Sequence, residues 1–108
     1  MTEVTNFRAV KSHWNRETCR WDDPKYCYIG RFNKTYGLRH SPFANPFVMG
    51  AESQRQGVID LYRTYIKEQI AQGRVNLEEL RGKTLVCWCS PKACHGDILL
   101  ELLNELVR

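Results

Sequence analysis

Hydrophobic and polar residues alternate in short segments near the N-terminus of the chain, and alternation of this kind is typical of strands. Residues 3–10 alternate in this way and include β-branched and aromatic side chains, so we expect a first strand there. Residues 26–30, Tyr-Cys-Tyr-Ile-Gly, predict a second strand. Residues 84–88 are almost continuously apolar, which is typical of a central strand buried on both faces. The chain therefore contains about three predicted strands.

Two longer segments have the period of a helix instead. Between residues 53 and 72 apolar side chains recur every three or four positions, at Val58, Tyr62, Tyr65, Ile66 and Ile70. Ser53 is a predicted N-cap of this helix, and Gly73 is predicted to end it. Residues 96–107 place their leucines on one broad face and predict a second main helix. Residues 76–80 predict only a short helical turn.

Two polar, irregular segments separate these elements. Residues 11–25 are rich in aromatic and basic side chains, and residues 32–50 contain two prolines, so both are predicted to be loops. Loops of this length in a small domain are usually functional or mobile. The role of the loop at residues 11–25 stays open.

The order of these elements predicts a small single-domain α/β sandwich over residues 1–108. Its sheet is expected to be at least partly parallel and Rossmann-like, because the segment between the second and third strands is long enough for a right-handed crossover. Ligands bind such sheets beyond the carboxyl ends of the strands. Gly30 and Arg31 follow the second strand, and a cysteine-rich stretch follows the third, so both are expected at one crevice.

Composition and charge exclude few classes of function. The chain has 108 residues, of which 43% are hydrophobic, and this is enough for one modest core. Its net charge of +4, from 16 basic and 12 acidic residues, permits a nucleotide or nucleic acid as partner without requiring one. No apolar run is long enough to cross a bilayer, and the N-terminus does not resemble a secretory signal. We therefore predict a cytoplasmic protein without a membrane partner.

The strongest chemical signal is a stretch in which three of the five cysteines and one of the three histidines fall between residues 87 and 95. Cys94 and His95 lie where the last predicted helix begins, and the amide groups and dipole of a helix N-terminus lower the pKa of a thiol. A catalytic interpretation makes Cys94 the thiolate, His95 its proton-transfer partner and Asp97 the orienting group. The accompanying ligand-binding residues are Gly30, Arg31, Asn45 and Gly96, with Arg31 contacting an anion.

Two other interpretations fit the same residues. Cys87, Cys89, Cys94 and His95 supply the sulfur and nitrogen ligands of a tetrahedral zinc site. Such a zinc module would bind nucleic acid or a host protein. Alternatively, the cysteines are buried core thiols and His95 caps the helix. The spacing alone leaves all three interpretations open.

Several motifs resemble a known family. In chain order they are Val4-Thr5-Asn6, Tyr28-Ile29-Gly30-Arg31, Asn45-Pro46-Phe47-Val48-Met49-Gly50, Leu80-Arg81-Gly82-Lys83, Cys87-Trp88-Cys89-Ser90-Pro91 and Cys94-His95-Gly96-Asp97. The series resembles the bacterial and phage family called domain of unknown function 4326. A looser similarity, limited to the apolar strand that ends at Cys87 and to Cys94-His95, connects the chain with domain of unknown function 488.

The resemblance implies an α/β fold and a role for the matching motif positions, which are Gly30, Arg31, Asn45, Pro46, Cys87, Cys89, Cys94, His95, Gly96 and Asp97. It does not imply an activity, so whether the protein is an enzyme stays open. The frequent presence of the family in phages implies a context of nucleotide or nucleic-acid metabolism.

Overall fold

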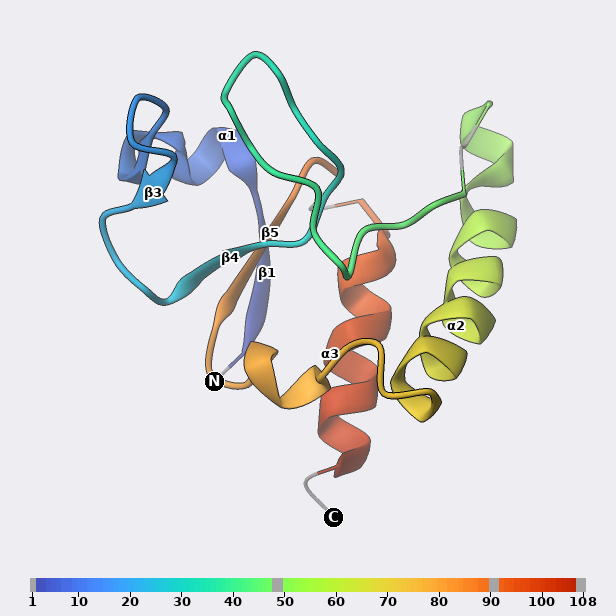
Figure 1. The fold of residues 1–108 in the computed structure, drawn as a ribbon. Helices are drawn as coiled ribbons and strands as arrows, with labels where there is room; N and C mark the ends of the chain where they lie inside the picture. Colours follow the sequence, from blue (N-terminus) through green and yellow to red (C-terminus); the bar gives the residue numbers. More distant parts are fainter. Residues whose placement is uncertain (1, 48–49, 90–91, 107–108) are drawn as a thin grey trace.

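A three-stranded parallel sheet lies at the centre of the structure (Figure 1). The structure, a computed structural model, describes residues 2–47, 50–89 and 92–106. The strands are β1 (Glu3–Asn6), β4 (Tyr26–Tyr28) and β5 (Thr84–Cys87), in the order β1-β5-β4. Both pairings are parallel. The predicted small α/β fold with a parallel sheet is therefore confirmed.

Strand β5 is the central strand, and its apolar sequence explains why. All four of its residues are buried. Val86 lies between Thr5 of β1 and Tyr28 of β4, and its side chain faces the opposite side of the sheet from Leu85 and Cys87. Burial on both faces is what the continuous apolar run predicted.

The two main helices, α2 (Arg55–Ala71) and α3 (His95–Leu106), lie on the same side of the sheet, with α3 next to it and α2 packed against α3 (Figure 1). They bury Tyr62 and Ile66 in a core shared with β5, and an ion pair between Arg63 and Glu101 joins them. A 3-10 turn, η2 (Glu52–Gln54), precedes α2, and another, η3 (Leu77–Leu80), precedes β5.

The ends of α2 correct one sequence prediction and agree with another. The N-cap of α2 is Gln54 and not Ser53. The N-cap therefore lies one residue later than predicted, and the Gln54 side chain accepts hydrogen bonds from the backbone N–H groups of Gly50 and Ala51. Gly73 has a φ of +72°, as expected of the glycine that follows a helix.

Only half of the first predicted strand is a strand. Phe7–Val10 form a helical turn, α1, which continues into a 3-10 turn, η1 (Lys11–His13). The Asn6 side chain accepts a hydrogen bond from the Arg8 N–H at 2.9 Å and so caps this turn. The turn carries the fully buried Phe7 ring into an apolar cluster. Alternation over eight residues does not reveal such a local cap.

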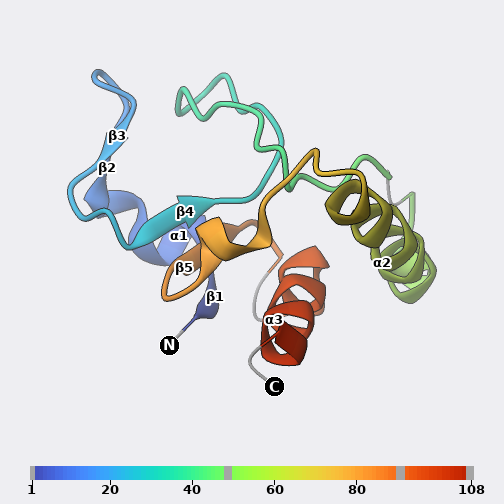
Figure 2. The same cartoon turned by 60° about the horizontal axis from the view of Figure 1, so that its bottom comes forward.

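The predicted loop at residues 11–25 also contains a small hairpin. Strands β2 (Trp14–Asn15) and β3 (Arg20–Trp21) pair antiparallel, with Trp14 opposite Trp21. Their aromatic side chains pack with others around Phe7 and Val86. The hairpin lies on the side of the sheet away from the helices (Figure 2). These aromatics build a second core.

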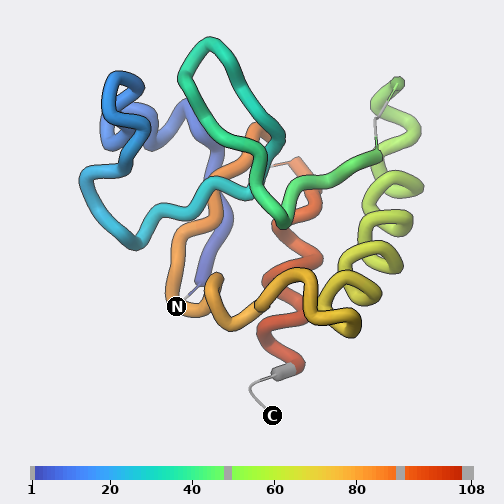
Figure 3. Tube along the Cα trace, in the orientation of Figure 1, coloured from blue at the N-terminus to red at the C-terminus, as the bar shows by residue number. Residues whose placement is uncertain are grey.

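The segment from residue 30 to residue 47 crosses from β4 to the start of α2 (Figure 3). Two hydrogen bonds hold this segment in place. The Ser41 N–H donates to the Gly30 carbonyl, and the buried Tyr62 hydroxyl donates to the Phe43 carbonyl at 2.7 Å. Between these anchors, Asn33 and Leu38 form an isolated bridge. This segment forms one wall of the site described next.

Candidate functional site

A pocket of about 360 Å³ opens at the carboxyl ends of β4 and β5. The segment from 30 to 47, the first turns of α2 and the start of α3 enclose it. Parallel pairing of β4 with β5 brings the residues after both strands to the same edge, as the sequence predicted. Most of the predicted site residues line this pocket, namely Gly30, Arg31, Asn45, Cys87, Cys89, Cys94 and His95. Gly96 and Asp97 do not line it.

Arg31 is fixed at the pocket by backbone carbonyls. Its Nε donates to the Asn45 carbonyl and its Nη2 to the Phe47 carbonyl, both at 2.7 Å. Neither hydrogen bond uses Nη1. Because two carbonyls hold the guanidinium in place, binding an anion there would cost little side-chain entropy.

An aromatic wall lies beside Arg31, and sequence analysis did not identify it. The Tyr28 hydroxyl donates to the Arg31 carbonyl at 2.6 Å and accepts from Trp88 Nε1 at 2.9 Å. The Tyr28 ring passes so close to Gly30 that a Cβ at position 30 would lie 2.5 Å from the hydroxyl oxygen. Burial raises the pKa of the Tyr28 hydroxyl, which therefore stays protonated. In the sequence, only the aromatic residues that flank Gly30-Arg31 could have indicated this wall.

The environment of Cys94 corrects the prediction of a lowered thiol pKa. Its side chain is 3% exposed, and its Sγ lies 3.4 Å from the Sγ of Cys87. The hydrogen bond with the Cys87 thiol raises the pKa of Cys94, and burial raises it further. The backbone N–H of Gly96 at the helix start acts in the predicted direction, but its effect is smaller. The contact with Cys87 and burial both favour the thiol form of Cys94 over the thiolate.

His95 is held in one orientation by a strand carbonyl. Its Nε2 lies 2.7 Å from the Ile29 carbonyl oxygen, and because a carbonyl only accepts, Nε2 carries the proton. The ring packs edge-on against Tyr62, with centroids 5.1 Å apart. Burial lowers the pKa of His95, so the neutral imidazole is favoured.

This burial predicts a pH dependence of stability. As the pH falls below about 6.5, the unfolded chain takes up a proton at His95 more readily than the folded chain does. The stabilisation is therefore complete above about pH 6.5 and is lost as the pH falls further. His95→Gln keeps an N–H donor for Ile29 but does not titrate. Between pH 7.5 and pH 5.5, the free energy of unfolding measured with urea should fall in both proteins. We expect the fall to be smaller in this variant than in the parent chain by up to about 1 kcal/mol. An equal loss in both proteins would contradict the assignment.

Asp97 and Gly96 shape the start of α3 and do not face the pocket. Asp97 Oδ2 accepts a hydrogen bond from the Cys94 N–H at 3.0 Å, which satisfies an otherwise unpaired amide at the helix N-terminus. A Cβ at Gly96 would lie 3.0 Å from both Cγ atoms of Val4. The absence of a side chain at position 96 thus lets the helix start approach β1.

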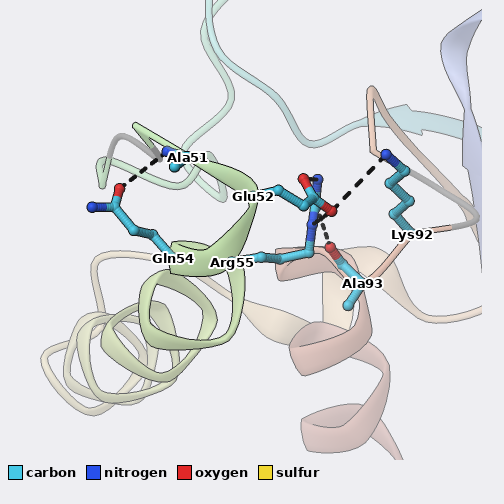
Figure 4. A network of polar contacts seen from close by, with 6 residues as sticks. All are labelled: Ala51, Glu52, Gln54, Arg55, Lys92 and Ala93. Carbon is cyan, nitrogen blue, oxygen red and sulfur yellow. Dashed lines mark hydrogen bonds and ion pairs between the residues drawn. The ribbon is translucent and has the colours of Figure 1, made fainter.

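Arg55 is a pocket residue that no sequence motif indicated. Its Nη1 donates to the Ala93 carbonyl at 2.7 Å, and its Nε and Nη2 each bond to Glu52 at 2.9 Å (Figure 4). Lys92 approaches the same carboxylate at 3.9 Å. Arg55 and Cys89 both line the pocket. These contacts join the start of α2 to the residues before α3, and Glu52 balances the charge of Arg55.

The zinc interpretation stays a prediction. Within residues 2–47, 50–89 and 92–106, no three or more His, Cys, Asp or Glu side chains are grouped so as to hold a metal ion. Cys87 and Cys94 are in contact, whereas His95 directs Nε2 to the Ile29 carbonyl. Metal analysis of protein purified without added zinc tests this interpretation. Over the same residues, none of the helices has the length and apolarity to span a bilayer.

Comparison with known proteins places the chain in a family. It is similar to a protein of Enterobacteria phage T4 described as "Uncharacterized 12.4 kDa protein in nrdA-td intergenic region". The two are 32% identical over 74 residues, which cover 66% of this chain and 68% of the phage protein. No solved structure matches the chain significantly. The sequence pattern of one family matches residues 12–105, so the chain belongs to the family described as domain of unknown function (DUF4326).

Proposed function

We propose that the pocket binds a nucleotide or a component of nucleic acid. The observation that carries this proposal is the placement of Arg31 beside an aromatic wall at the carboxyl ends of β4 and β5. Arg31 binds a phosphate group through Nη1, and the base packs against aromatic side chains. Charge-assisted hydrogen bonds from a guanidinium suit phosphate, and aromatic rings stack on any base.

The charge around the pocket supports this choice. Two arginines, Arg31 and Arg55, line the pocket, and the described residues that line it include no Asp or Glu. Phe32, next to Arg31 on the pocket rim, is 65% exposed. An exposed ring beside a guanidinium favours a ligand that is both planar and anionic.

The proposal requires no thiolate. Cys94 is buried and its thiol form is favoured, so a nucleophilic role for it stays a prediction that needs a proton acceptor. Alkylation of Cys94 followed against pH tests that role separately. A midpoint below that of free cysteine would restore the catalytic interpretation.

The experiment that tests binding is calorimetric titration with inorganic phosphate, nucleoside monophosphates and triphosphates, and a short single-stranded oligonucleotide. We expect Arg31→Ala to weaken nucleotide binding about 10–100-fold, because one charge-assisted hydrogen bond is worth roughly 1.5–3 kcal/mol.

The matched control is Arg39→Ala, which removes an exposed arginine of the same segment that does not line the pocket. It should leave the affinity unchanged. Thermal melts of both variants separate a loss of binding from a loss of fold, since Arg31 also holds Asn45 and Phe47. Absence of binding by every ligand of the panel, or equal losses in the two variants, would refute the proposal.

A further inference from the structure

Two thiols are in contact at the wall of the pocket. Cys87 is the last residue of β5, and Cys94 is the residue before α3. Their sulfur atoms are 3.4 Å apart, and the residues are seven positions apart in the chain. Both side chains are almost fully buried, yet both contribute to the pocket lining. The sheet and the helix thus each present one thiol to the other.

We propose that Cys87 and Cys94 form a redox-active dithiol, which a peroxide oxidises to a disulfide and a small dithiol reductant restores. This site is independent of ligand binding by Arg31. A disulfide has an S–S distance of about 2.05 Å, so the two sulfurs must approach by roughly 1.4 Å. Rotation of two short side chains at the ends of their elements supplies a movement of this size.

The chemistry balances with hydrogen peroxide as the oxidant. The sulfur of Cys87 attacks one peroxide oxygen, the O–O bond breaks, and a sulfenic acid and one water form. The sulfur of Cys94 then attacks the sulfenic sulfur, the S–S bond forms, and a second water leaves. The two sulfurs lose two electrons, which reduce the two peroxide oxygens. In the reverse step, a dithiol reductant is oxidised to its own disulfide.

Access to the pair comes from the pocket. Cys87 and Cys94 both line it, so peroxide can reach either sulfur, and the steps balance equally with the two roles exchanged. Peroxide is close to water in size, so a pocket of about 360 Å³ admits it readily.

The test uses the whole chain, reduced and then freed of reductant. After exposure to hydrogen peroxide, remaining thiols are counted in denaturant and the protein is digested with trypsin. We expect the loss of two of the five thiols. We also expect a cross-linked peptide that joins residues 84–92 to residues 93–108. A dithiol reductant should separate the two peptides.

Because Cys87 and Cys89 fall in the same tryptic peptide, two variants identify the partner. Cys89→Ser should still form the cross-link, and Cys87→Ser should abolish it. Cys27→Ser is the matched control, because Cys27 lies on neighbouring β4 and does not line the pocket. It should behave as the parent chain does. A cross-link that requires Cys89, or five intact thiols at a peroxide level that oxidises free cysteine, would overturn the proposal. The thiol count of the parent chain and the Cys89→Ser variant keep the proposal testable even if Cys87→Ser does not fold.

Discussion

Phe7→Ala is expected to lower the free energy of unfolding by about 3–5 kcal/mol. Phe7 is fully buried, and its ring centroid lies 4.8 Å from that of Tyr36 and 4.9 Å from that of Trp88. Truncation leaves a cavity among rings that are too large to close over it. Since a domain of this size is stable by only about 5–15 kcal/mol, the loss is a large fraction of the total.

Urea unfolding followed by circular dichroism measures this effect. Arg8→Ala is the control, because Arg8 is the next residue in the same helical turn and its side chain is exposed. A loss below about 1 kcal/mol for Phe7→Ala, comparable to a surface change, would mean that the second core contributes little to stability.

Gly30→Ala is the second large expected effect, and it acts on both the fold and the pocket. The new methyl group would lie 2.5 Å from the Tyr28 hydroxyl oxygen and 2.6 Å from its Cζ, so the ring must move. Moving it breaks the hydrogen bonds with Trp88 and with the Arg31 carbonyl. We expect a destabilisation of roughly 2–3 kcal/mol. We also expect loss of the nucleotide binding proposed for this pocket.

Gly57→Ala is the matched control, since nothing lies within 4 Å of a Cβ at position 57 on helix α2. Alanine is the better helix former, so this variant should gain about 0.5–1 kcal/mol. Thermal unfolding of both variants and calorimetric titration measure the two effects. If Gly30→Ala were as stable as the parent, the close packing of Tyr28 over Gly30 would be wrong.

Long periodic segments of the sequence predicted the fold well. The continuous apolar run at residues 84–88 indicated the central strand, and the spacing of Tyr62 and Ile66 indicated the helix that buries them. Both signals report burial directly. The helical turn at Phe7 was missed because four residues are too few for periodicity, and the Asn6 cap decides the outcome.

The candidate site was predictable in position but not in chemistry. Parallel strands bring Arg31 and the cysteine stretch to one edge, and topology alone gives this result. The sign of the Cys94 pKa shift depends instead on its contact with Cys87, which comes from another element. Arg55 joins the pocket from the first turn of α2, which carries no motif. Contacts of this kind arise only when the helices are docked on the sheet.

The strand order also has a consequence for how the protein is made. Strands β1 and β4 do not pair with each other, because each is hydrogen-bonded only to β5 within the three-stranded sheet. The ribosome releases β5 well after both of its neighbours, so β1 and β4 must wait for residues 84–87 before the three-stranded sheet can form. Contacts between such distant parts of a chain slow folding and leave apolar segments exposed meanwhile. Until then, a nascent chain lacks the paired carboxyl ends of β4 and β5 at which the pocket forms.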